Sequence, residues 1–286
     1  MSALVQSIVS GLLLGGIYAV MAVGLDIIYG VLDLVHMAFG DFVMLAMYTS
    51  FFFYTLFGLN EFLILFVVPL LFLILGIPLY YGIFKFMIGK PHSFHIFYTA
   101  SLSIALEAAA LIFWTSIPRR MGVPYAQEAI ELGSIILNKA LIIAFILAVI
   151  ITILVFIFLF KTDLGTLIRA AISNRDLIEM IGIDPHKVYL LAFCLGMSLI
   201  GVGGVLLAYY YPVSPTVGLA YTTYMWIAIV IGGPGSIVGS IVGSCIIGLS
   251  QTVSALYFPV ALQNVFMLFI FIIVLNVKPK GLFGSR

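Results

Sequence analysis

Residues 161–187, KTDLGTLIRAAISNRDLIEMIGIDPHK, decide the fold because they separate two long apolar parts of the chain. The sequence has 12 Lys and Arg and 11 Asp and Glu residues, and eight of these charged residues fall in this one stretch. Apolar runs of helix length flank it on both sides. We therefore expect a membrane protein whose central loop meets a partner in the cytoplasm.

The composition excludes a soluble globular protein. The chain is 64% hydrophobic and 8% charged, with a mean hydropathy of +1.29, whereas soluble domains carry about 25% charged residues. The apolar runs are continuous rather than alternating, so they predict membrane-spanning helices and not barrel strands. We expect an all-α polytopic membrane protein, with residues 1–286 forming a single transmembrane domain. The net charge of +1 gives no reason to expect a nucleic-acid partner.

About eight to ten transmembrane helices are expected from the number of apolar runs. These runs cover residues 4–24, 37–57, 61–84, 94–117, 140–160, 188–211, 219–235, 236–257 and 259–276. Gly232-Gly233-Pro234-Gly235 interrupts the last long apolar region, so 219–257 is either two spans or one broken span beside a pathway. Residues 24–36 could form a loop, a re-entrant segment or a short further crossing. This ambiguity leaves open the side on which the N-terminus lies.

The basic residues predict the orientation, because Lys and Arg are enriched on the cytoplasmic side. If the loop 161–187 lies on the cytoplasmic side of the membrane, then residues 85–93 and the C-terminal tail lie on that side too. Nine of the 12 basic residues are then cytoplasmic. The exceptions are Arg119, Arg120 and Lys139. No Lys or Arg precedes Lys85, so we expect the first span to be retained rather than cleaved as a signal peptide.

The central loop has the pattern of two short amphipathic helices that meet at an angle near Asn174. Its apolar residues recur at helical spacing: Leu164, Leu167, Ile168, Ala171 and Ile172 before Asn174, and Leu177, Ile178 and Ile181 after it. Gly182 suits a helix C-cap, and Asp184-Pro185 suits an N-cap followed by a first-turn proline. Such helices could lie on lipid headgroups or in a groove of another protein. The four acidic residues of the loop favour the protein groove, because they oppose binding to an anionic leaflet.

These segments resemble one transporter family. Residues 165–208, from GTLIRAAISN to GVGGVLLA, are similar to the coupling segment and following helix of ATP-binding-cassette importer permeases for branched-chain amino acids. IVIGGPGSIVGSIVGSCIIGL (229–249) and VKPKGLFG (277–284) resemble the glycine-rich helix pair and the ending of that family. Residues 11–45 are similar to the N-terminus of its LivH-type members, with His-Met-Ala-Phe-Gly at 36–40 in place of Asn-Phe-Ala-His-Gly.

The resemblance implies a mechanism and a set of partners. A second permease, identical or homologous, would complete the pathway across the cell (inner) membrane. Two ATPase subunits would bind ATP, and an extracytoplasmic binding protein would deliver a small amino acid, so the chain itself would need no cofactor. The residues that the resemblance places in the ATPase-coupling segment are Gly165, Arg169, Ala170, Asn174, Gly182 and Ile183, of which Gly165 and Gly182 suit backbone turns. The apolar face of the loop adds Leu177 and Ile178 as residues expected to dock against an ATPase.

No motif of a catalytic or metal site accompanies this pattern. The sequence lacks the Gly-x-x-x-x-Gly-Lys-Ser/Thr of a phosphate-binding loop, so ATP hydrolysis is expected in partner subunits. His92 and His95 are spaced like metal ligands, but without a third ligand nearby in sequence we predict no metal site. Cys194 and Cys245 lie in apolar spans, where small buried side chains are expected.

Polar residues and glycines inside spans are the candidates for the pathway. They are Asp41, Glu107, Gln251, Asn264, Gly232 and Gly235. A secondary transporter is the alternative function, since broken helices also hold substrate and ions in that class. It requires carboxylates near the break, and the sequence around 232–235 shows none. We also expect a mostly apolar route that binds substrate only weakly.

Overall fold

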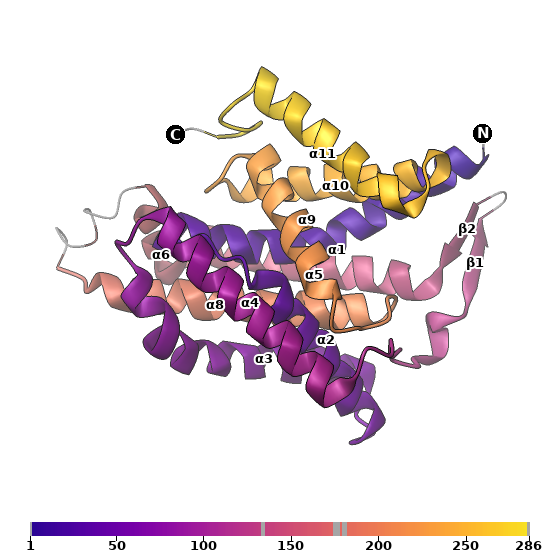
Figure 1. Cartoon of the computed structure of the whole chain (residues 1–286), viewed down its shortest axis with the longest axis horizontal. Coiled ribbons are helices and arrows are strands. Elements are labelled where there is room, and N and C mark those ends of the chain that lie inside the picture. The colour runs from indigo at the N-terminus through magenta and orange to yellow at the C-terminus, as the bar shows by residue number, and fades with distance from the viewer. Residues whose placement is uncertain (1, 133–134, 174–177, 179–181, 285–286) are drawn as a thin grey trace.

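The structure is a computed structural model that describes residues 2–132, 135–173, 178 and 182–284. It confirms the all-α fold (Figure 1). In this described part, six helices are long and apolar enough to cross a membrane. They are α1 (Ser2–Leu32), α3 (Glu61–Leu79), α4 (His92–Trp114), α5 (Lys139–Lys161), α8 (Pro185–Ala208) and α10 (Ile237–Tyr257). The remaining helices are α2 (Phe39–Thr55), α6 (Asp163–Ser173), α9 (Val217–Gly232) and α11 (Val260–Val277).

Side-chain caps and prolines set several helix boundaries. Asn60 and Asn138 accept hydrogen bonds from the first turns of α3 and α5. Asp184 caps α8 and Pro185 opens it, which confirms the predicted start. Pro78 lies near the end of α3, directly before a π-helical turn (Tyr80–Phe84) and a short 3₁₀-helix (Lys85–Met87). A proline removes one helical hydrogen bond, which favours such an irregular continuation.

The long helices run between two ends of the molecule, which we call the α6 end and the hairpin end. The hairpin end contains a two-stranded antiparallel ribbon, β1 (Ala129–Leu132) and β2 (Ile135–Asn138), which the hydropathy pattern did not predict. A short 3₁₀-helix (Pro124–Ala126) precedes it. Figure 1 shows the N-terminus at the hairpin end and the C-terminus at the α6 end. The N-terminus therefore lies opposite α6, which answers the question left open by residues 24–36.

Residues 24–36 do not form an additional crossing. Helix α1 continues without interruption to Leu32 and ends at Asp33, whose φ of 54° is left-handed. The chain then runs without regular helix as far as Ala38, and α2 begins at Phe39. This segment, residues 33–38, is called the α1–α2 break below.

Glycines bring the central helices into close contact. Helix α1 crosses α10 where Gly11 and Gly15 face Gly248, and a Cβ atom added to Gly248 would meet the backbone of both partners. Small residues allow helix backbones to approach in this way. The glycines at this crossing therefore serve helix packing.

Replacing Gly248 with Ala should destabilise the membrane domain by about 1–3 kcal/mol, because the methyl group cannot fit without separating α1 from α10. Gly82→Ala is the matched control, since a Cβ atom there would meet nothing within 4 Å. Thermal unfolding of both purified variants in the same detergent measures the difference. Equal melting temperatures for the two variants would contradict this account of the crossing.

Candidate functional site

Helix α6 folds back against the end of α5. Thr162 joins the two helices, and its hydroxyl accepts a hydrogen bond from the Gly165 backbone N–H at 3.1 Å. A Cβ atom at Gly165 would collide with the backbone of Phe158 and Leu159. Glycine is therefore required at 165 by this close approach, and no left-handed φ is recorded there.

Arg169 fastens α6 to α5 rather than extending away from the protein. Its Nε donates to the Leu159 carbonyl at 2.8 Å, and its guanidinium lies 4.6 Å from the centre of the Phe160 ring. A terminal guanidinium nitrogen also donates to the Thr166 hydroxyl at 3.3 Å. These contacts fix the angle at which α6 leaves the membrane helices.

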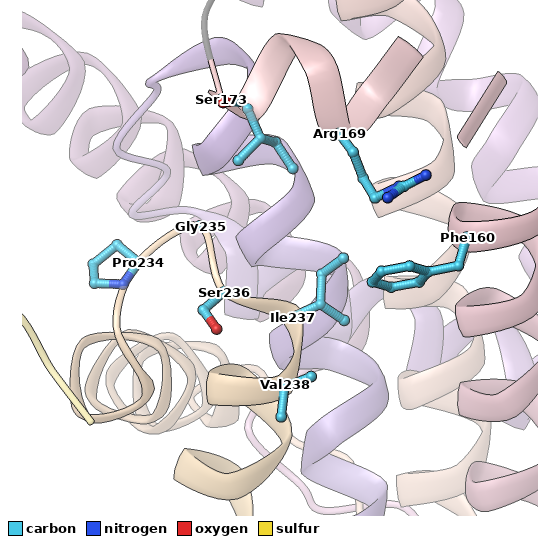
Figure 2. A pocket seen from close by; sticks show the side chains of 9 residues that line it. Phe160, Arg169, Ser173, Pro234, Gly235, Ser236, Ile237 and Val238 are labelled. Atoms are coloured by element: carbon cyan, nitrogen blue, oxygen red, sulfur yellow. The ribbon is translucent and has the colours of Figure 1, made fainter. Parts of the chain in front are cut away.

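A cavity of about 490 Å³ separates α6 from the turn between α9 and α10. Figure 2 shows the Phe160 ring pointing towards Ile237, with Arg169 beside it and Pro234 on the opposite wall. Residues 234–238 form one side of the cavity, and Phe160, Arg169, Ile172 and Ser173 form the other. The expected coupling segment and the expected helix break thus face each other.

The α9–α10 turn is anchored by Asp26, a residue of α1. The Gly235 backbone N–H donates to Asp26 Oδ1 at 2.7 Å, and both Gly233 and Gly235 have left-handed φ values, of 103° and 83°. Asp26 is 1% exposed. This corrects the expectation that no carboxylate lies near the 232–235 break: the missing carboxylate comes from more than 200 positions earlier in the chain.

The predicted division of 219–257 into two helices is confirmed, and the glycines explain how they pack. Gly232 at the end of α9 lies against Gly239 of α10, with no room for a Cβ atom on either. The C-terminal tail closes the same end, because Leu282 N–H and Phe283 N–H donate to the Ile231 and Gly232 carbonyls, both at 2.8 Å. These bonds satisfy carbonyl groups that the end of a helix leaves free.

The second half of the coupling loop is described only in part. Asn174 and Leu177 lie outside the described residues. Ile178 is fully buried among the chain's own apolar side chains, so it is not exposed to a partner here. Gly182 has the left-handed φ of 75° expected for a C-cap glycine, and Ile183 N–H donates to the Ile178 carbonyl at 3.2 Å.

Helix α6 also has an apolar side that is turned away from the buried one, and three further residues lie on it. Gly165, Ile168 and Ala171 are buried on the inner side, whereas Leu164 is 48% exposed and lies on the outer side. Leu167 and Ala170 follow Leu164 at helical spacing and are partly buried. We call Leu164, Leu167 and Ala170 the outer face of α6.

The α1–α2 break enters the helix bundle, where side chains of α4 and α9 bind its backbone. Thr99 accepts from Met37 N–H at 3.0 Å and donates to the Val35 carbonyl at 3.3 Å. Thr222 donates to the Met37 carbonyl at 3.0 Å, and the Trp226 indole donates to the His36 carbonyl at 3.2 Å. Irregular backbone inside a membrane requires such internal partners.

The pathway candidates fall into three separate places. Asp41 and Glu107 come together between α2 and α4, next to the α1–α2 break. Gln251 and Asn264 are each bound by a tyrosine, Tyr18 at 2.8 Å and Tyr224 at 3.4 Å, and the rings of the two tyrosines are 5.9 Å apart. Gly232 and Gly235 lie at the α6 end and belong to the α9–α10 turn.

The histidine pair has local partners. His92 Nε2 lies 3.4 Å from Asp33 Oδ1, and His95 Nε2 lies 2.8 Å from the Met87 carbonyl oxygen. In the described ranges, no three His, Cys, Asp or Glu side chains are grouped so that they could hold a metal ion.

Comparison with known proteins identifies the family. The family model described as "Branched-chain amino acid transport system / permease component" matches residues 7–275. The chain belongs to this permease family. No solved structure is significantly similar to it.

Relatives in bacteria and archaea match the permease over almost its whole length. It is 25% identical to the high-affinity branched-chain amino acid transport system permease protein BraD of Pseudomonas aeruginosa, over 98% of this chain and 95% of the relative. The corresponding LivH protein of Escherichia coli K12 is 24% identical over the same shares. A probable LivH permease of Methanocaldococcus jannaschii is 25% identical over 92% of this chain and 87% of the relative.

Sequence reasoning missed the residues that hold the permease's two backbone breaks. Asp26 could have been noticed as a carboxylate inside an apolar span, where an ionisable residue is costly and needs a partner. Thr99, Thr222 and Trp226 gave no signal of this kind, because threonine and tryptophan are ordinary in membrane helices.

Replacing Asp26 with Ala should cost about 1–3 kcal/mol of stability, because it leaves the Gly235 N–H inside the protein without an acceptor. Asp26→Asn keeps an oxygen in the same place and should be closer to the wild type. The measurement is thermal unfolding of both variants in detergent. If both substitutions lower the melting temperature equally, the hydrogen bond to Gly235 is not what Asp26 contributes.

Proposed function

We propose that this chain is the membrane-spanning permease subunit of an ATP-binding-cassette importer for branched-chain or similar small amino acids. The family match over residues 7–275 carries this proposal. In this proposal residues 1–286 form one transmembrane domain in the cell (inner) membrane. The relatives named above are described as branched-chain amino acid transport permeases, which supports the same substrate class.

The distribution of charge supports a cytoplasmic position for the α6 end. The described basic residues Lys161, Arg169 and Lys187 belong to the coupling loop, and Lys280 shares a cavity with the α9–α10 turn beside it. Lys139 and Arg119 lie at the hairpin end. With the α6 end inside, the bias of basic residues agrees with the positive-inside rule, and the hairpin end faces the binding protein.

ATP binding and hydrolysis belong to two partner subunits in this proposal, and a second permease completes the pathway. The outer face of α6 is the docking surface for an ATPase subunit. A movement of α6 would be transmitted to the membrane helices through Ile172. This side chain lies against Gly30 of α1 and against Gly235 in the α9–α10 turn. Gly165, Arg169 and Gly182 set the shape of the coupling segment, while Ala170 contributes to the contact surface.

Reconstitution tests the function. The chain by itself should hydrolyse no ATP, whereas proteoliposomes containing it with both ATPase subunits, the second permease and the binding protein should accumulate leucine in an ATP-dependent manner. Uptake of radiolabelled leucine and release of phosphate are measured on the same vesicles. Hydrolysis by the isolated chain, or leucine uptake driven by an ion gradient without ATP, would contradict the proposal.

The docking surface has its own test. Replacing Leu164 and Leu167 with Ala should weaken association with the ATPase subunits about tenfold or more, because each buried leucine contributes about 1.5–3 kcal/mol. Leu56→Ala is the matched control, since Leu56 is 72% exposed at the hairpin end. Association is measured by binding of purified ATPase subunits to the permease in nanodiscs. Unchanged affinity in the double variant would place the contact elsewhere.

A further inference from the structure

The first turn of α2 contains a buried carboxylate that the coupling contacts do not use. Asp41 is 1% exposed, and its Oδ2 atom has no hydrogen-bond partner among the described residues. The described residues form the ion pairs His92–Asp33 and Lys139–Glu128, and Asp41 belongs to neither of them.

The surroundings of Asp41 satisfy a buried negative charge only in part. Asp41 lies at the N-terminus of α2, where the helix dipole favours an anion. The Ser103 hydroxyl of α4 is a hydrogen-bond partner of Asp41, but the neighbouring Glu107 carboxyl has the same sign of charge. A buried charge is costly without a partner of opposite sign, and a passing positively charged group would supply that partner.

The carboxylate lies beside irregular backbone inside the bundle. Gly40 N–H donates to the Thr222 hydroxyl at 2.9 Å, so the residue before Asp41 is bound to α9. On the other side, the Asp41 side chain lies against Gly218, where a Cβ atom would collide with Oδ1. These contacts hold the start of α2 against α9 and leave α4 as the element that covers Asp41.

Helix α4, which covers Asp41, has few buried side chains, although Thr99 binds it to the α1–α2 break. Of its side chains, only His95, Thr99 and Ala110 are buried within the described chain. Ser103 and Glu107 are half-buried, and the neighbouring Ile104 is 70% exposed. A helix held by so few buried side chains can shift more easily than α1 or α8, most of whose residues are buried.

We propose that Asp41 binds the ammonium group of the amino-acid substrate as it passes the α1–α2 break. This inference rests on the proposed function, and it adds the residue that recognises the charged amine. The ammonium supplies the missing positive charge and hydrogen-bond donors for Oδ2. Because the contact involves one carboxylate and the coupled binding protein captures the substrate first, binding at Asp41 is brief and the substrate is released.

The first test uses the complete transporter in proteoliposomes. Asp41→Asn removes the charge and should lower leucine uptake about tenfold, in line with the loss of one charged hydrogen bond. ATP hydrolysis stimulated by the binding protein should continue, because the docking surfaces are unchanged. Asp41→Glu restores the charge and should recover part of the uptake. Normal leucine uptake per ATP hydrolysed in Asp41→Asn would overturn the proposal.

A second pair of variants avoids any effect on the buried start of α2. Glu107→Lys places a permanent ammonium group next to Asp41 and should block leucine uptake while ATP hydrolysis persists. Glu107→Gln, at the same half-buried position, is the matched control, because it removes the Glu107 charge without adding an ammonium group, and it should lower uptake far less than Glu107→Lys does. Equal uptake by the two variants would overturn the proposal even if Asp41→Asn failed to fold.

The outcomes separate this inference from the proposed function. If the wild-type transporter accumulates no leucine with its partners present, the proposed function fails. If the wild type accumulates leucine and the Asp41 and Glu107 variants transport it equally well, only the role of Asp41 fails. Loss of uptake together with loss of hydrolysis in Asp41→Asn and Asp41→Glu would also count against it, since a purely structural role predicts that result.

Discussion

Backbone hydrogen bonding without water is the constraint on which this structure depends. In a bilayer each N–H and C=O group must find a partner within the protein, and the chain leaves helical structure at two functionally important places. At the α1–α2 break, Thr99, Thr222 and Trp226 provide the partners. At the α9–α10 turn, Asp26 and the C-terminal tail provide them. Each break is therefore held by residues that are distant in sequence.

These partners connect the breaks to the rest of the molecule. Helix α1 takes part in both, because it ends at the first break and carries Asp26 for the second. Ile172 of α6 contacts α1 at Gly30 and approaches the second break at Gly235. A displacement of α6 thus acts on one continuous helix that reaches from the α6 end to the hairpin end. Helix α4 has few buried side chains, and Thr99 ties it to the first break.

Much of the fold follows from local signals in the sequence. These signals are the long apolar runs, the Asp184-Pro185 start and the Gly232–Gly235 interruption. Each depends on interactions within a few residues, and the structure has helices and helix boundaries at those places. The basic residues also divide between the two ends, with Arg119 and Lys139 at the hairpin end as the exceptions to the positive-inside bias. Asp41 was visible as a candidate because charged residues are rare in apolar spans, whereas Asp26 was not assigned a role.

The partners of those residues could not be predicted, because they depend on how helices pack in space. Asp26 and Gly235 are joined across most of the chain, and the sequence around the break itself contains no carboxylate. The continuous α1 was also hidden, since Gly24, Asp26 and Gly30 resemble loop residues. Within α1 they serve instead as close-packing sites and as a hydrogen-bond acceptor. The outer face of α6 needed the structure too, because periodicity alone does not tell which apolar stripe faces inward.

The C-terminal tail has a consequence for biosynthesis. Residues 281–284 are synthesised after the helices α1 to α11, yet Leu282 and Phe283 bind the carbonyl groups at the end of α9. A nascent chain that has already inserted these helices still lacks the two bonds until the tail has followed. A permease cut before Leu282 would leave the two carbonyls free beside the α9–α10 turn. The order of synthesis thus makes the α6 end the part of the helix bundle that is completed after the helices themselves.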